Sequence, residues 1–235
     1  SSQSLREDWR KDHRHLRLFV GQMGVMTLDT RMHRCHPRCD ATGGSLLIGA
    51  QQWKDIEASL APEGALGGKQ TSLLLVCTPL PLCYLCPAAS ALIAEKLELP
   101  DLHGHLATAA HAPEQRRLLL RLAAWQAAVP RRRVVILAGD VHAGCETLID
   151  VPVRGSKPQQ LWQLVSSPIS NKNLAKWENI LCTTSLRVFG KDGRAVTNSL
   201  TETIDIGEGI TCKHENFVRE RNFGEILLAL DGDEP

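Results

Sequence analysis

Two short, uninterrupted apolar runs constrain the fold of this chain more than any other feature. They span residues 72–78 (SLLLVCT) and 134–138 (VVILA), and proline or glycine follows each run. Strands that are half exposed alternate apolar and polar side chains, whereas continuous apolar runs of this length are typical of strands buried on both faces. Such strands need a layer of structure on each side, so the runs predict a layered domain.

Helical patterns lie between and beside these runs. Residues 48–60 place Trp53, Ile56 and Leu60 at spacings of three and four, and residues 114–129 follow Pro113 with a similar apolar face. Further strands are predicted within 16–29 as a short hairpin, and at 160–165, 186–189 and 224–230. Residues 1–15 are polar and are interpreted as a tail or a helix end. The alternation of strands and helices predicts the α/β class.

Composition excludes several classes of function. The 235 residues carry 27 Lys+Arg and 26 Asp+Glu, a net charge of +1, so charge gives no reason to expect a nucleic acid as partner. No apolar stretch approaches the roughly 18 residues of a membrane span, and no signal peptide is visible. The chain has eight cysteines, several in strand-like runs, and it contains no N-glycosylation sequon. These features favour a reducing, cytoplasmic location, although they leave the localisation open.

The clearest chemical motif follows the second apolar run. In Gly139-Asp140-Val141-His142, an aspartate and a histidine two residues apart come directly after the carboxyl end of a strand. Side chains two apart on extended backbone point the same way, and ligands bind at this edge of open α/β sheets. A carboxylate beside an imidazole suits a divalent metal. The alternative is a turn aspartate and a hydrogen-bonded histidine with no metal.

The cysteines allow a second metal hypothesis. Cys35 and Cys39 lie in a loop rich in histidine and arginine, and Cys83 and Cys86 form a CxxC pair. Four thiolates of this kind are a zinc ligand set. The alternative is that two surface loops carry these cysteines without binding a metal.

Several motifs together resemble the PhoD-like phosphatases of the calcineurin-like metallophosphoesterase superfamily. Gly139-Asp140-Val141-His142 resembles the last metal motif of that family. Four further segments resemble family segments in the same order: Leu28-Asp29-Thr30-Arg31, Ile48-Gly49-Ala50-Gln51-Gln52-Trp53, Ser166-Ser167-Pro168-Ile169-Ser170-Asn171 and Glu220-Arg221-Asn222-Phe223-Gly224. The resemblance covers roughly residues 17–230, and it identifies residues 16–235 as the C-terminal portion of a PhoD-like domain.

This resemblance implies a fold and an activity. The fold would be a layered sandwich of mixed β-sheets with flanking helices, and the activity a metal-dependent hydrolysis of phosphoesters by activated water. Asp140 and His142 would be metal residues, and Arg31 would clamp phosphate oxygens. Asn171, with Ser167, would line the site. The alternative for Arg31 is a structural contact with Asp29 or with a loop carbonyl, and for Asn171 and Ser167 it is loop capping.

The chain also departs from the family pattern. The earlier metal motifs of the family are not found. His103 and His105 could be ligands, but a polar loop between helices is the simpler interpretation of this region, which also holds His111. We therefore expect a fold that is incomplete on its N-terminal side, and a site for two divalent or trivalent metal ions that is also incomplete. The missing half or a partner chain would complete both, and without it the apolar strands would be exposed.

Two other functions stay open. One is a PhoD-like scaffold that has kept the fold and serves as an interaction module without catalysis. The other is a binding domain stabilised by zinc on the four cysteines.

Overall fold

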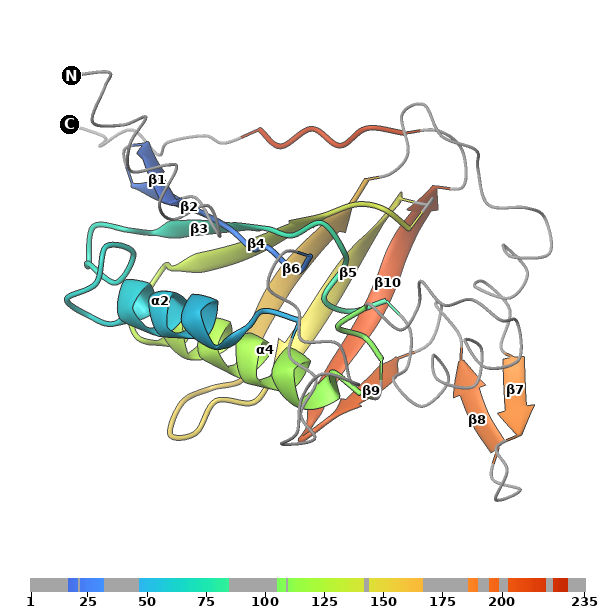
Figure 1. The fold of residues 1–235 in the computed structure, drawn as a ribbon. Helices are drawn as coiled ribbons and strands as arrows, with labels where there is room; N and C mark the ends of the chain where they lie inside the picture. The colour runs from blue at the N-terminus through green and yellow to red at the C-terminus, as the bar shows by residue number, and fades with distance from the viewer. Residues whose placement is uncertain are drawn as a thin grey trace.

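The structure is a computed structural model. It describes residues 17–20, 22–31, 47–84, 105–108, 110–141, 144–166, 186–189, 195–198, 203–218 and 222–227. Within these ranges the chain forms strands and two helices (Figure 1): β1 (Arg17–Val20), β2 (Met23–Thr27), α2 (Ala50–Leu60), β3 (Leu73–Cys77), α4 (Ala112–Ala127), β4 (Arg133–Ala138), β5 (Gly144–Val151), β6 (Gln159–Val165), β7 (Leu186–Phe189), β8 (Ala195–Asn198), β9 (Ile204–Gly207) and β10 (Ile210–Val218).

Eight of the strands form one mixed sheet in the order β1-β2-β3-β4-β6-β5-β10-β9, and β7 pairs with β8 in a separate hairpin. The central strands β2, β3, β4 and β6 are parallel to one another. The outer strands pair in antiparallel fashion, with β1 on β2 at one side and β5, β10 and β9 at the other. Because four neighbouring strands are parallel, their carboxyl ends meet at one edge of the sheet.

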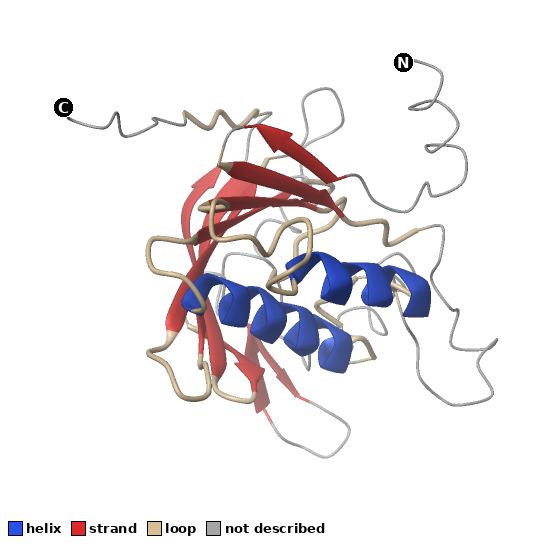
Figure 2. Cartoon of the chain, turned by 90° about the vertical axis from the view of Figure 1, so that its left-hand side faces the viewer, coloured by secondary structure: helices blue, strands red, loops and turns tan. Residues whose placement is uncertain are grey.

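Both helices lie on the same face of the large sheet (Figure 2). The core between helices and sheet is apolar: Ile56 of α2 and Leu122 of α4 are fully buried with Leu74, Val76 and Ile136 of the sheet. These three strand residues occupy alternate positions, because successive side chains on a strand point to opposite faces. The chain therefore buries one face of its sheet thoroughly.

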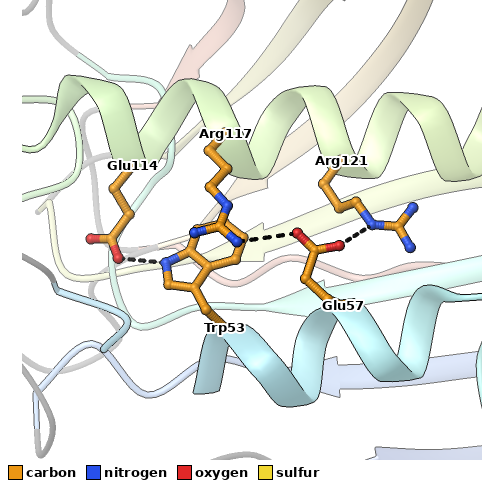
Figure 3. A network of polar contacts seen from close by, with 5 residues as sticks. All are labelled: Trp53, Glu57, Glu114, Arg117 and Arg121. Carbon is orange, nitrogen blue, oxygen red and sulfur yellow. Dashed lines mark hydrogen bonds and ion pairs between the residues drawn. The ribbon is translucent and has the colours of Figure 1, made fainter. Parts of the chain in front are cut away.

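The two helices are held together by polar contacts as well (Figure 3). The guanidinium of Arg117 on α4 stacks 4.0 Å from the ring centre of Trp53 on α2. Glu57 of α2 accepts from Arg121 at 2.7 Å and from Arg117 at 3.4 Å. A hollow of about 420 Å³ lies beside these residues, between the helices. Two charged side chains of its lining, Glu57 and Arg117, are paired with one another.

The structure confirms the α/β class and most of the predicted elements. The hairpin within 16–29, the helices and the strands at 72–78, 134–138, 160–165 and 186–189 are present with shifts of one or two residues. The prediction of a strand at 224–230 is wrong for residues 224–227, which belong to no strand, and residues 228–230 lie outside the described part of the chain. Strands β5, β8, β9 and β10 were not predicted. Residues 1–15 lie outside the described part of the chain.

The described residues form one large mixed sheet with helices on one face, rather than the two large sheets packed together that a sandwich of sheets would have (Figure 2). Neither described helix is long and apolar enough to cross a membrane.

Candidate functional site at the carboxyl edge of the sheet

The predicted site segments follow the carboxyl ends of the parallel strands. Asp29 comes after β2, Asp140 after β4 and Ser166 after β6. The register places these ends at one level, because Thr27 of β2 pairs with Cys77, Cys77 with Leu137, and Leu137 with Leu164. This edge is where ligands bind in open α/β sheets. The fold thus brings together segments that are far apart in the sequence.

Arg31 and Asp140 meet at this edge. Nη2 of Arg31 donates to Oδ2 of Asp140 at 3.0 Å across 109 residues of sequence. The two side chains are 65% and 50% exposed, so the pair faces solvent. An ion pair this exposed contributes little to stability, about 0–1 kcal/mol. Its position is therefore not explained by a large gain in folding free energy.

The backbone at Asp140 is unusual for a residue with a side chain. Its φ is +68°, in the left-handed region that non-glycine residues seldom adopt. Strained backbone of this kind costs on the order of 1 kcal/mol or more and tends to occur at functional sites. The turn after β4 holds the Asp140 carboxylate toward Arg31.

A buried glutamine positions the loop that carries Arg31. Gln52 of α2 accepts from the backbone N–H of Asp29 at 2.9 Å and donates to the carbonyl of Asp29 at 2.8 Å. The Asp29 carboxylate in turn accepts the backbone N–H of Arg31 at 2.8 Å. Gln52 is 1% exposed. The interactions form a continuous chain from the buried start of α2 to the exposed guanidinium.

Two further motif segments meet beside β5. Oγ of Ser166 donates to Oδ1 of Asn222 at 3.1 Å. Gly144, the first residue of β5, lies so close to Asn222 that a Cβ there would come within 2.9 Å of the amide oxygen. The Ser-Ser and Arg-Asn-x-Gly segments therefore contact one another, and glycine at position 144 allows the approach.

The other predicted site residues are not all described. His142, Asn171, Ser167 and His103 lie outside the described residues, so their placement stays a prediction. His111 is buried at the start of α4. Arg31 contacts Asp29 as the structural alternative proposed, but through its backbone N–H, and its guanidinium pairs with Asp140 instead.

Of the four cysteines in the zinc hypothesis, the structure describes Cys83. Cys35, Cys39 and Cys86 lie outside the described residues. Cys83 is fully buried, with the amide of Gln115 4.0 Å from its sulfur. A side-chain hydrogen bond with Cys212, together with burial, raises the pKa of the Cys83 thiol well above its usual value.

Sequence reasoning did not single out Gln52 and Asn222 as site residues, although both belong to motifs that it recognised. The sequence signal for each residue is an amide side chain inside a recognised motif. The role of that amide becomes apparent only when the structure shows which atoms it contacts.

The described residues supply part of a metal-binding donor set. Asp140 offers a carboxylate of the right type, and no group of three His, Cys, Asp or Glu side chains in the described part of the chain is arranged to hold a metal ion. His142, the second predicted ligand, was outside that search. The donor chemistry at Asp140 therefore fits a cation, and the described set alone does not complete its coordination.

Comparison with known proteins decides the fold. A solved structure described as the structure of PhoD superimposes with a TM-score of 0.50 and 13% sequence identity over 88% of this chain. The chain has the fold of part of PhoD. It spans only 34% of the length of that PhoD chain. No family model and no curated protein matches the sequence. The PhoD-like fold predicted from the motifs is thus confirmed, and the identity is too low for the likeness to show more than the fold.

Proposed function

We propose that this chain carries part of the active site of a metal-dependent phosphoester hydrolase. The observation that supports this most strongly is the meeting of Arg31 and Asp140 at the carboxyl edge of β2 and β4. The likeness to part of PhoD supports the same conclusion, because the segments that resemble PhoD-like motifs gather at that edge.

The roles follow from the chemistry of the residues. The planar guanidinium of Arg31 presents several N–H donors that match the oxygens of a phosphoryl group. Asp140, with His142, would hold the metal by carboxylate and imidazole ligation. A divalent cation bound there would polarise the phosphoryl group and activate water. Asn171 would line the same site.

The ion pair suggests how Arg31 is kept ready. The Asp140 carboxylate orients the guanidinium from one side, while Asp29 fixes the backbone of Arg31 through its N–H. A phosphoester dianion or monoanion would compete with Asp140 for the same donors. On binding, Arg31 would exchange Asp140 for the phosphoryl oxygens, and Asp140 would exchange Arg31 for the metal ion. Each charged group would therefore keep a partner of opposite charge when the ion pair separates.

The test is hydrolysis of para-nitrophenyl phosphate and its bis ester with Mn²⁺ present, together with calorimetric titration of Mn²⁺. We expect Asp140→Asn to weaken Mn²⁺ binding at least about tenfold and to lower kcat about 100-fold. Arg31→Lys keeps the charge but loses the planar donors, so it lowers kcat/KM while Mn²⁺ binding changes little.

The control is Asp150→Asn, which removes an exposed carboxylate from the other end of β5. Because the Arg31–Asp140 pair is exposed, Asp140→Asn changes the free energy of unfolding by less than about 1 kcal/mol. Loss of activity in a folded variant is therefore informative. Equal Mn²⁺ binding by Asp140→Asn and by Asp150→Asn would refute the metal role.

A second candidate is a PhoD-like scaffold without catalysis. It is favoured by one observation: Arg31 already occupies the Asp140 carboxylate that a metal would use. This candidate predicts no Mn²⁺ heat and no hydrolysis in the parent chain, whereas the enzyme predicts both. The same two measurements therefore separate the candidates.

A further inference from the structure

The connection between β4 and β5 joins two strands that are not neighbours. β4 ends at Ala138 and β5 begins at Gly144, yet β6 lies between the two strands in the sheet. Since neighbouring strands are about 4.8 Å apart, the connection covers roughly 10 Å beside the carboxyl end of β6. Asp140 lies on this β4–β5 connection, of which the structure describes residues 139–141. The contacts that hold the connection therefore also place the Asp140 carboxylate.

The described part of the connection has a conformation that needs support. Val141 is buried in the apolar core, whereas the side chain of Asp140 directly before it is half exposed. The backbone at Asp140 has a φ of +68°. A residue other than glycine keeps such a conformation only where the surrounding structure holds it.

Ser166 holds the start of the connection. Its backbone N–H donates to the carbonyl of Ala138, the last residue of β4, at 3.0 Å. Its hydroxyl donates to Oδ1 of Asn222 at 3.1 Å. Ser166 therefore links the end of β4 to a side chain that lies 56 residues further along the chain.

Asn222 lies against the end of the connection. A Cβ on Gly144 would come within 2.9 Å of Oδ1 and 3.1 Å of Cγ of Asn222. Gly144 is an ordinary strand residue and does not have a positive φ. Glycine at this position therefore provides room for the Asn222 amide rather than an unusual backbone conformation.

We propose that Asn222 is a positioning residue for Asp140, which it places by tying together the two ends of the β4–β5 connection. Its amide contacts one end at Gly144, and it reaches the other end at Ala138 through Ser166. The proposal rests on the metal role proposed for Asp140. Contacts that orient a metal ligand commonly set the affinity of the site, and losing one costs about 10–100-fold in metal affinity.

Calorimetric titration of Mn²⁺ into the full 235-residue chain tests the proposal. Asn222→Ala and Ser166→Ala should each weaken Mn²⁺ binding about tenfold, because each breaks the link between the two ends. Ser166→Thr keeps the hydroxyl, so it should bind Mn²⁺ as the parent does. The matched control is Gln160→Ala, which removes another amide hydrogen bond of 3.1 Å at the opposite end of β6 and should leave Mn²⁺ binding unchanged. Circular dichroism verifies that each variant is folded.

Two double variants test whether Asn222 is the link. Gly144→Ala should weaken Mn²⁺ binding in the parent, because the added methyl group displaces the Asn222 amide. The same change should cost nothing further in an Asn222→Ala background, where the amide is absent. Ser166→Ala combined with Asn222→Ala should likewise bind Mn²⁺ no more weakly than either single variant. Residues that act through one shared contact are non-additive in this way.

A measurement without metal separates this inference from the hydrolase proposal. Asn222→Ala should shift the amide NMR signals of Gly139 and Asp140, whereas Gln160→Ala should leave them in place. If the parent binds no Mn²⁺, the metal role of Asp140 is refuted, and these signals alone decide whether Asn222 sets the connection.

Three results would overturn the inference. Equal Mn²⁺ affinities of the parent and a folded Asn222→Ala variant would leave the metal site intact without any contribution from Asn222. Additive losses in Gly144→Ala and Asn222→Ala would mean that the two residues act separately. Unchanged amide signals of Gly139 and Asp140 in Asn222→Ala would show that the connection keeps its conformation without the amide.

Discussion

Arg132 lies in a run of three arginines, yet its side chain is buried with 3% exposed. A run of arginines between a helix and a strand, such as residues 131–133, usually keeps the junction solvated, but Arg132 does not have that role. Its guanidinium donates to the carbonyls of Gly67, Gly68, Thr71 and Trp125 at 2.7–3.2 Å and stacks 4.2 Å from the Trp125 ring centre. Five N–H donors let one side chain satisfy a loop of backbone oxygens.

We predict that Arg132→Met lowers the free energy of unfolding by about 3 kcal/mol, because several buried carbonyls lose a charged donor at once. Urea denaturation measures the change. The matched control is Arg131→Gln, an exposed neighbour whose change should stay within about 0.5 kcal/mol. Similar losses in the two variants would contradict the role of the buried guanidinium.

His214 is a second buried residue with a defined protonation state. Its Nδ1 accepts from the Thr147 hydroxyl at 2.8 Å, and its Nε2 donates to the carbonyl of Tyr84 at 3.0 Å. The Gln163 amide donates to the same hydroxyl at 3.1 Å, so that hydroxyl is left to donate to the imidazole. Burial lowers the pKa of His214 to about 4, which keeps the ring neutral.

A pKa lowered on folding makes stability depend on pH in one direction. Between pH 6.5 and pH 4 the unfolded chain binds a proton at His214 that the folded chain does not, so stability falls as the pH falls. The full contribution, about 3 kcal/mol, is present above the unfolded pKa near 6.5. Denaturation of the parent and of His214→Gln across pH 5–7 should show a steeper slope in the parent. Parallel curves would refute this.

Helix α2 depends on α4 for its start. Its N-cap is Gly49, with φ +78° and no side-chain cap. Glu114 of α4 instead anchors the segment that leads into the helix: it accepts from the backbone N–H groups of Leu47 and Ile48 at 2.7 and 3.3 Å and from Nε1 of Trp53 at 2.7 Å. The carboxylate also lies at the positive end of the α2 dipole. One buried side chain thus fixes the end of the helix that carries Gln52.

We expect Glu114→Gln to lower the free energy of unfolding by about 2 kcal/mol, because the amide nitrogen must face N–H donors. Glu57→Gln, which breaks only exposed ion pairs, should change it by less than about 1 kcal/mol. Thermal denaturation of both variants measures the difference. A Glu57→Gln loss equal to that of Glu114→Gln would show that surface ion pairs, rather than the buried contacts of Glu114, hold α2.

The hydrophobic pattern of the sequence predicted some strands and missed others, and the difference between them has a physical reason. The runs that form β3 and β4 are apolar at nearly every position, and they were recognised. Strands β5 and β10 carry Glu146, Asp150, Lys213 and Glu215 at alternate positions, on the face of the sheet opposite the helices. Because charged and apolar residues alternate, β5 and β10 contain no long continuous apolar run. Strand β9 has four residues, which is too short for a clear pattern.

At the scale of the whole molecule, the expectation of exposed apolar strands stays a prediction. On the open face of the sheet, opposite the helices, the apolar side chains of β2, β3 and β4 are partly buried, and Trp162 of β6 is 50% exposed. The proposed hydrolytic site is at the carboxyl edge of the same strands. The sheet therefore offers two regions of interest, one polar at its edge and one apolar on its open face.

The sequence alone determined the local features of this protein. Apolar runs, helical spacing and turn residues act over a few positions, so they predicted β3, β4, both helices and the placement of Asp140 after a strand. The ordered motifs predicted the PhoD-like fold. Only the tertiary structure decided which distant residues meet: Arg31 with Asp140, Ser166 with Asn222, Glu114 with the start of α2, and Arg132 with its loop of carbonyls. Strand order and register set these contacts, and both arise from packing between segments that no local pattern encodes.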